Sequence, residues 1–200
     1  GRVKRCSAAG SCTVFASGLG VPTDVGAASD GVVYVSDWSR HVVWRFAANG
    51  SAQGAFAGAP GVPYLTNASL FNGPAGVAVA PDGSLYVLEN PGYRLLKQDA
   101  AGQPLWSVGQ AGVPGSDNAH FGDYWQGPQG TLAIDAAGRV YVPDTANHRI
   151  QVFNANGAFQ RSFGSQGVGD TQFECPSGVA INPVNQDILV VDPCNQRVQI

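Results

Sequence analysis

Charged side chains are scarce in this chain of 200 residues, at 12% of its composition, which is about half the fraction usual in soluble domains. Lysine occurs only at Lys4 and Lys97, the formal net charge is -3, and arginine and lysine form no cluster. Binding to the phosphates of nucleic acids requires such a cluster, so we exclude nucleic acid from the expected partners. We also expect no membrane insertion from this segment, and we find no helical period of useful length.

Repetition, by contrast, dominates the chain. Four similar units open at Pro22, Pro74, Pro128 and Pro176, which are 52, 54 and 48 residues apart. In each unit a Val- and Ala-rich run follows the proline, then a turn and a second apolar run that ends in Asp or Glu, with further runs after it. Runs of β-branched and aromatic residues bounded by Gly, Pro, Asn and Asp are typical of strands. Four-stranded units repeated at this period indicate the blades of a β-propeller.

Residues 71–83, 144–153 and 173–181 resemble NHL repeats. The resemblance extends over essentially the whole chain. It implies an all-β fold, a β-propeller of four-stranded antiparallel blades, with six blades in the parent protein. About four and a quarter repeats are present in this sequence. The resemblance implies no single function, because different functions are built onto such folds.

The repeat boundaries predict one incomplete propeller over residues 1–200. Residues 1–18 would end one blade, residues 19–70, 71–124 and 125–172 would form three whole blades, and residues 173–200 would start the next. Because the first residues align with Gln196 to Val198 and methionine is absent, we expect this chain to be part of a longer protein. The opening prolines should begin the innermost strands, where crowded blades require small side chains.

The four cysteines predict two disulfides. Cys6 and Cys12 should face each other across a hairpin, and Cys175 and Cys194 flank another hairpin symmetrically. Each pair is thus expected at roughly the separation that a disulfide needs. Zinc binding is the alternative, but no CxxC motif and no neighbouring histidine accompany these positions. Two disulfides predict an extracellular location or the lumen of the secretory pathway.

Candidate surface features lie in the connections between strands. Asn49 and Asn67 begin glycosylation sequons at predicted exposed turns. The segment of residues 110–126 is long, aromatic and rich in Gly and Pro, and loops on one rim of a propeller usually carry recognition. Phe121, Tyr124 and Trp125 are therefore predicted to contact a protein or sugar partner. The alternative is that Phe121 or Trp125 packs between blades.

Acidic residues and histidines recur with the repeat rather than interrupting it. We interpret the acidic residue that ends each second strand as a structural acceptor for loop amides and for a following Arg or Asn, with a cation site as the alternative. A nearby position tolerates His, Tyr and Gln, which favours a loop or packing role over a metal ligand. His120 has no predicted partner. The acidic positions are Asp37, Glu89, Asp144 and Asp192, and the variable positions are His41, Tyr93, His148 and Gln196.

Among enzymes of this fold, the peptidyl-hydroxyglycine lyases are the nearest comparison, and they hold zinc with histidines that typically follow the proline of strand one. The matching residues in this sequence are Thr23, Ala75, Gln129 and Ser177, and none can replace a zinc-binding imidazole. No G-x-S-x-G, H-E-x-x-H or phosphate-loop motif is present either. We therefore predict no catalytic, cofactor-binding or metal-binding residue in this segment.

The resulting hypothesis is a non-catalytic, extracellular interaction or scaffold module. It would bind protein or glycan partners, or pack into a larger assembly that includes copies of itself. A low surface charge suits burial in an interface, because interface cores are depleted of charge. The alternative is an extracellular lyase or hydrolase whose metal site is completed by blades outside this sequence.

Overall fold

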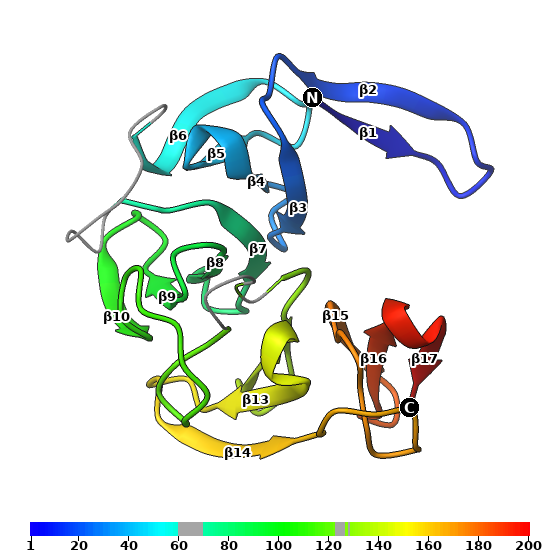
Figure 1. Ribbon diagram of the computed structural model, residues 1–200. Coiled ribbons are helices and arrows are strands. Elements are labelled where there is room, and N and C mark those ends of the chain that lie inside the picture. The colour runs from blue at the N-terminus through cyan, green and yellow to red at the C-terminus, as the bar shows by residue number, and fades with distance from the viewer. Residues whose placement is uncertain (60–69, 123–126, 128) are drawn as a thin grey trace.

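A computed structural model describes residues 1–59, 70–122, 127 and 129–200. Within these residues the chain forms 17 strands and three short 3-10 helices, and the strands assemble into five antiparallel sheets. The sheets follow one another in an arc around a central opening (Figure 1). The chain is therefore an all-β propeller of antiparallel blades, as the repeat predicts. None of the helices in these residues has the length and apolar character needed to cross a membrane.

Three sheets have four strands each, one sheet has two strands and one has three. Along the chain they are β1 (Arg2–Cys6) and β2 (Cys12–Ser17); β3 (Pro22–Ala27), β4 (Val33–Asp37), β5 (Val42–Phe46) and β6 (Ala52–Gly58); β7 (Pro74–Val79), β8 (Leu85–Glu89), β9 (Leu95–Gln98) and β10 (Pro104–Val108); β11 (Ala133–Ile134), β12 (Val140–Asp144), β13 (Arg149–Phe153) and β14 (Phe159–Phe163); and β15 (Gly178–Ile181), β16 (Ile188–Asp192) and β17 (Arg197–Gln199). The 3-10 helices η1 (Trp38–Arg40), η2 (Thr145–Asn147) and η3 (Pro193–Asn195) each follow the second strand of a blade.

The first strand of each blade is the innermost one. β3 and β7 begin at Pro22 and Pro74. Figure 1 shows β3, β7 and β15 nearest the central opening, with β6, β10 and β14 on the outside. The predicted register is thus confirmed for these blades. Pro176 precedes β15 by two residues, whereas Pro128 lies outside the described residues.

The innermost strand of the third full blade is shorter than those of the other two full blades. β11 contains only Ala133 and Ile134. Thr131 instead forms a parallel bridge with Gly178 of the next blade, and its carbonyl accepts the amide of Val179 at 3.1 Å. At Thr131 the backbone thus pairs with the neighbouring blade, and pairing with β12 begins at Ala133.

The hydrophobic core lies between the blades. A tyrosine on the second strand of each full blade, Tyr34, Tyr86 or Tyr141, is buried against apolar residues of the following blade. Because neighbours cover both faces of the inner blades, every residue of β8 and β12 is buried. This two-sided burial explains why these strands are continuous apolar runs rather than alternating ones.

Both predicted cysteine pairs are joined as disulfides. Cys6 lies opposite Cys12 across the β1–β2 hairpin, with their Cα atoms 4.0 Å apart. Cys175, just ahead of β15, is bonded to Cys194 in η3 across a sequence separation of 19. Each bridge therefore fixes a single hairpin of one blade and links no two blades together.

The disulfide that closes the longer loop should stabilise the fold more than the other. Replacing Cys175 and Cys194 by serine should lower the free energy of unfolding by about 3 kcal/mol, and replacing Cys6 and Cys12 by about 2 kcal/mol, because a cross-link restricts the unfolded chain more when it closes a longer loop. Urea unfolding of the full-length protein and of the two double variants measures both losses. A larger loss for the Cys6 and Cys12 variant would contradict this explanation.

Candidate functional site

The acidic residue that ends the second strand is fully buried in every blade that has one, at 0% exposure for Asp37, Glu89, Asp144 and Asp192. Each carboxylate accepts backbone N–H groups from the segment that leads into the first strand of its own blade. The donor amides are Gly20 at 2.8 Å and Val21 at 3.0 Å for the first, Asn72 at 2.9 Å for the second, Gly122 at 2.7 Å for the third, and Glu174 at 3.0 Å and Cys175 at 3.1 Å for the fourth. The repeated acid therefore ties the incoming connection to the blade, which is the structural role that the sequence favours.

Three of these carboxylates also pair with an arginine that begins the third strand or directly precedes it. Arg94 donates two hydrogen bonds to the carboxylate of Glu89, from Nε at 2.7 Å and from Nη2 at 2.9 Å. Arg149 donates to Asp144 at 2.8 Å, and an arginine on β17 donates to Asp192 at 3.3 Å. In the first full blade, the corresponding place holds Val42, and the indole of Trp44 donates to Asp37 at 3.1 Å instead.

The balance between burial and hydrogen bonding differs from one acid to the next. Burial is the largest influence at Asp144 and raises the pKa of its carboxyl above the ordinary value, although Gly122, Arg149 and Asn147 all donate to it. At Asp192 burial acts in the same direction, but the bonds from Asn195 and from the loop amides together hold the pKa below its ordinary value. In both blades the carboxylate oxygens are occupied by donors of the protein itself, which leaves them no free lone pairs for a substrate or cation.

The variable position of the repeat has one backbone conformation in all four blades. His41, Tyr93, His148 and Gln196 have φ between 54 and 56°, in the left-handed region, and they end a turn or a 3-10 helix. The imidazole Nδ1 of His41 accepts the amide of Gly73 at 3.1 Å, and that of His148 contacts the carbonyl of Glu174. These histidines contact the connection that leads into the next blade. Within the described part of the chain, no three His, Cys, Asp or Glu side chains are grouped so that they could hold a metal ion.

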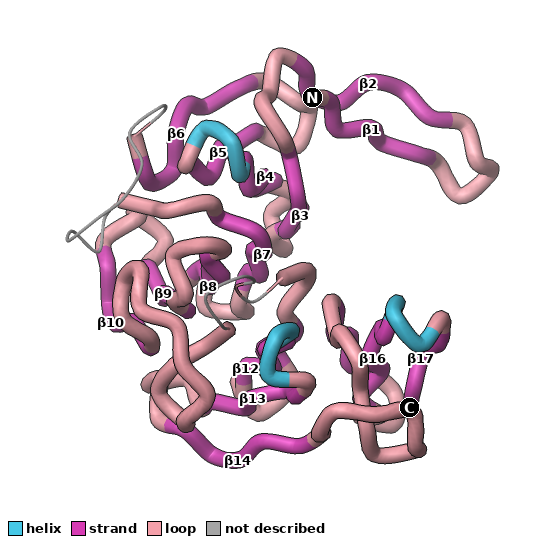
Figure 2. Tube along the Cα trace, in the orientation of Figure 1, coloured by secondary structure: helices cyan, strands magenta, loops and turns pink. Residues whose placement is uncertain are grey.

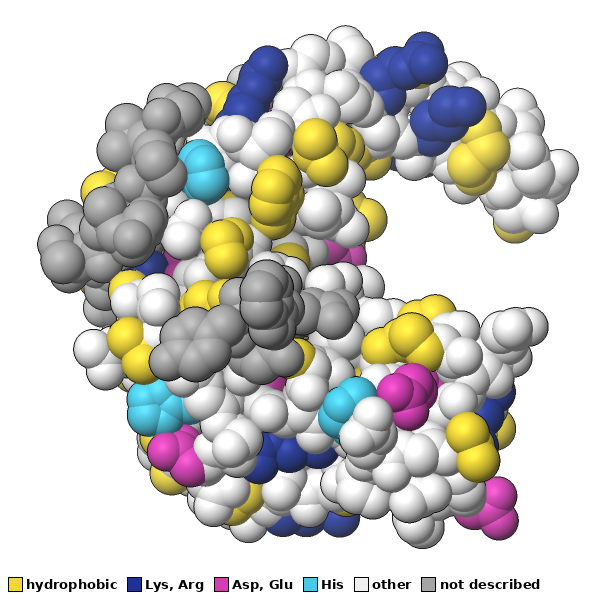
Figure 3. Space-filling view, in the orientation of Figure 1, with side chains coloured by type: hydrophobic (Ala, Val, Ile, Leu, Met, Phe, Trp, Pro, Cys, Tyr) yellow, Lys and Arg dark blue, Asp and Glu magenta, His cyan; other side chains and the backbone are white. Residues whose placement is uncertain are grey.

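A cavity of about 430 Å³ lies where the three full blades meet near the axis. We call it the axial pocket; its lining residues are Val21, Thr23, Trp38, Ala75, Asn90, Gln129 and Gly130. It lies on the side of the blades that carries the 3-10 helices (Figure 2), because Trp38 begins η1. Figure 3 shows this side: most of the surface around the central opening is uncharged, and charged side chains are scattered.

Three of the four residues that match the zinc-binding positions of the lyases line the axial pocket. Thr23, Ala75 and Gln129 all line it, whereas Ser177 does not. A hydroxyl, a methyl group and a carboxamide do not form a zinc site. Thr23 is already engaged, since its Oγ1 is 3.0 Å from Ser36 Oγ and donates to the carbonyl of Pro74 at 3.0 Å. The described residues of the pocket thus supply neutral polar groups and no metal ligands.

Trp38 is the functional candidate that the sequence reasoning missed. Its side chain is 43% exposed, and its indole N–H donates to the carbonyl of Asn90 in the next blade at 2.6 Å, which fixes the ring over the pocket. The available signal was the residue that directly follows the repeated acid, which is tryptophan in this blade and Asn90, Thr145 or Pro193 in the others.

The predicted partner loop requires a correction. Phe121 is fully buried and packs against Phe153 with ring centroids 5.8 Å apart, so it is a core residue between blades and cannot contact a partner. Tyr124 and Trp125 lie outside the described residues, as does the sequon at Asn67. Asn49 is exposed, as a glycosylation site must be.

The fold and the repeated buried carboxylate define a β-propeller assembled from copies of one blade. The NHL repeat family matches residues 127–153 and 173–200. Human NHL repeat-containing protein 3 is 29% identical over 143 residues, which are 67% of this chain and 36% of that protein. The chain therefore belongs to the NHL-repeat β-propellers.

An amidating monooxygenase and a lyase are also similar to this chain. Peptidylglycine alpha-amidating monooxygenase of Rattus norvegicus is 30% identical over 138 residues, which are 66% of this chain and 14% of the rat protein. Virginiamycin B lyase from Staphylococcus aureus superposes with a TM-score of 0.67 at 13% identity, over 97% of this chain and 57% of that one. At this identity the structural likeness shows the fold alone. The match spans 14% and 36% of the two curated relatives.

A buried arginine should contribute more to stability than a half-exposed one when each is bonded to a buried carboxylate. Arg94→Met should lower the free energy of unfolding by about 3 kcal/mol, because it leaves Glu89 buried without its counter-ion. Arg139→Met is the matched control: its bond to Asp135, which is buried too, is as short, at 2.6 Å, but the arginine side chain is 46% exposed. Asp135 would keep the amides of Ala137 and Arg139 and the hydroxyl of Tyr141 as donors, so this variant should lose only about 1 kcal/mol. Equal losses in urea unfolding would show that burial of the arginine is not what matters.

The free energy of unfolding should depend on pH through Asp24, which is next to Thr23. Burial raises the pKa of its carboxyl, although Oδ2 accepts the amide of Val77 in the next blade at 2.9 Å. With a raised folded-state pKa, the ionised form costs stability at neutral pH, and this cost vanishes below the ordinary pKa of 3.8. Asp24→Asn should therefore raise the free energy of unfolding at neutral pH, and the difference from wild type should shrink on acidification. A gain in urea unfolding that is equal at every pH would contradict this.

Proposed function

We propose that this NHL propeller is a non-catalytic interaction module of an extracellular or secretory-pathway protein, and that the axial pocket contacts its partner. The observation that carries the proposal is Trp38. It is an exposed tryptophan held rigidly by a bond to the next blade, above a pocket of neutral groups. Rigid aromatic anchors of this kind contribute disproportionately to binding energy at protein interfaces.

The cysteines support the proposed compartment. All four are in disulfides and none is free, and structural disulfides persist in oxidising compartments. The similarity to the rat amidating enzyme is compatible with an extracellular or secretory location. The exposed sequon at Asn49 fits that environment too.

The lining of the axial pocket supports binding over catalysis. The four recurring acids are buried and occupied by loop amides, and each is also paired with an arginine, Asp37 with Arg40 at 4.0 Å and the others with Arg94, Arg149 and Arg197. General acid–base chemistry needs a titratable group within reach of a substrate, and the lining of the axial pocket contains none among its described residues. A neutral, partly apolar surface instead suits a protein or glycan partner, or a second copy of the propeller.

A lyase is the second candidate, and the similarity to the amidating enzyme favours it. It requires blades beyond this segment to supply every zinc ligand, because the matching positions here hold no imidazole. Assay of the full-length protein on a peptidyl-hydroxyglycine substrate, with and without a chelator, decides between the two. Turnover that is lost on chelation and restored by zinc would replace the interaction proposal.

Site-specific cross-linking tests the proposed contact. A photo-reactive phenylalanine placed at Trp38 in the full-length protein should form adducts with the native partner. The same group at Val184, which is 90% exposed in the β15–β16 turn, should form none. The native protein should also be larger than a monomer by light scattering. A strictly monomeric protein without adducts at Trp38 would overturn the proposal.

A further inference from the structure

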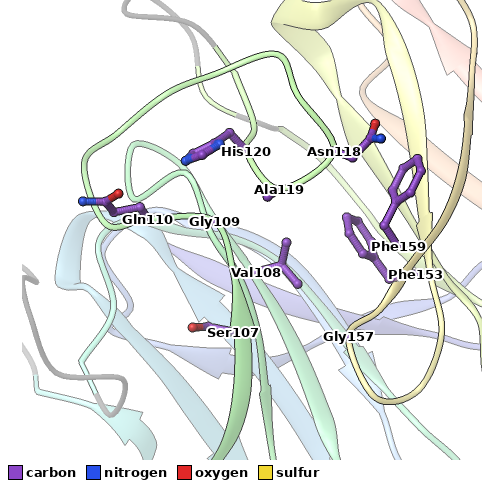
Figure 4. A pocket seen from close by; sticks show the side chains of 10 residues that line it. All are labelled: Ser107, Val108, Gly109, Gln110, Asn118, Ala119, His120, Phe153, Gly157 and Phe159. Carbon is purple, nitrogen blue, oxygen red and sulfur yellow. The ribbon is translucent and has the colours of Figure 1, made fainter.

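A second cavity, of about 420 Å³, lies between the outer parts of the second and third full blades. We call it the rim pocket. Figure 4 shows it beneath the loop that follows β10, with Val108, Phe153 and Phe159 below and Gln110, Asn118 and His120 on the loop above. Ser107, Gly109, Ala119 and Gly157 complete its lining. None of these residues belongs to the axial pocket.

The loop that roofs the rim pocket is held in place by the acid cluster of the third blade. Asn147 donates to the carbonyl of Gly115 at 2.9 Å and Arg149 to that of Asp117 at 2.6 Å. Gln151 donates to the carbonyl of His120 at 2.8 Å. Because these donors also bond to the buried Asp144, the roof is prebuilt, and a ligand would not need to order it.

The pocket has an apolar floor and a neutral polar rim. Phe153 is fully buried and meets Phe159 edge to face with ring centroids 6.0 Å apart. The rim offers two carboxamides, a hydroxyl and an imidazole. Carboxamides and hydroxyls both donate and accept hydrogen bonds. His120 Nδ1 lies 2.8 Å from Asp117; in the tautomer that donates this bond, Nε2 is an acceptor.

The lining chemistry selects among ligand classes. A cationic ligand would call for a carboxylate, and an anionic one for arginine, lysine or a nest of amides; the ten lining residues include no Asp, Glu, Lys or Arg. A purely apolar ligand would leave the polar rim without hydrogen-bond partners, at a cost. A pyranose ring meets both demands, because it has an apolar C–H face and a rim of neutral hydroxyls.

We propose that the rim pocket binds an uncharged sugar residue of a glycan. Its volume falls within the range of small-ligand sites. The proposal extends the interaction role above to a second site and names the ligand class there. It is independent of what contacts Trp38, so either site can fail without the other.

The test applies the full-length protein to an array of neutral, sialylated and sulfated oligosaccharides at low and high salt. We expect binding to neutral glycans that changes little with salt, since no charge pair is involved. The strongest neutral ligand is then titrated against variants by calorimetry. Asn118→Ala should weaken binding about tenfold, the loss of one or two hydrogen bonds. Ser107→Trp, at an exposed position of β10, should fill the cavity and abolish binding.

Gln160→Ala is the matched control, because Gln160 is exposed on β14 beside Phe159 but does not line the pocket. It should bind as wild type does, and none of the three variants should alter the cross-links formed at Trp38. The sugar proposal is overturned if no neutral glycan binds, if binding requires acidic sugars and disappears in high salt, or if Ser107→Trp binds normally.

Discussion

One interaction recurs in four of the five described sheets and supports the rest of the fold: a buried carboxylate that accepts amides from the chain entering the blade. Loop amides next to a core would otherwise be buried without partners, and a lone buried carboxylate would be equally costly. Each group satisfies the other. Since the acid ends the second strand and the amides precede the first, the bond also fixes where each blade begins, and hence where Pro22 and Pro74 enter the axis.

Contacts between blades repeat as well, although less strictly. Arg5 donates to the carbonyl of Ala48 in the turn of the next blade, and Lys97 and Trp106 both donate to the carbonyl of Ala155, at 3.3 Å and 3.1 Å. Gly157 allows the close approach, because a Cβ there would lie 2.9 Å from the Trp106 ring. The outer parts of neighbouring blades are thus held together by a cation or an indole on one blade and a carbonyl in a turn of the next.

Aligning the copies of the repeat predicted most of the fold, because aligned residues occupy the same strand and the same register in each blade. The strands, the innermost position of the first strand, the structural acid and both cysteine pairs all follow from which residues share a place in the unit. What the repeat could not predict lies where the copies differ. Phe121 belongs to a connection of unique length, and its partner Phe153 comes from another strand 32 residues later. Periodicity says nothing about the side to which such a loop folds. Trp38 was missed for the same reason, since its neighbours in the repeat are an amide, a hydroxyl and a proline.

The structure explains how the few charged side chains of this chain are used. Several of the few charged side chains are used inside the protein: Glu89 pairs with Arg94, Asp144 with Arg149 and Asp192 with Arg197, and Lys97 is 7% exposed. Groups committed to interior pairs cannot steer a charged ligand through solvent or activate a water molecule. Both cavities are accordingly lined by amides, hydroxyls and aromatic rings. Recognition by such surfaces depends on shape and on neutral hydrogen bonds, which salt does not screen. A propeller that uses its charges to hold the strands and incoming connection of each blade together is therefore suited to partners that are themselves uncharged at the contact.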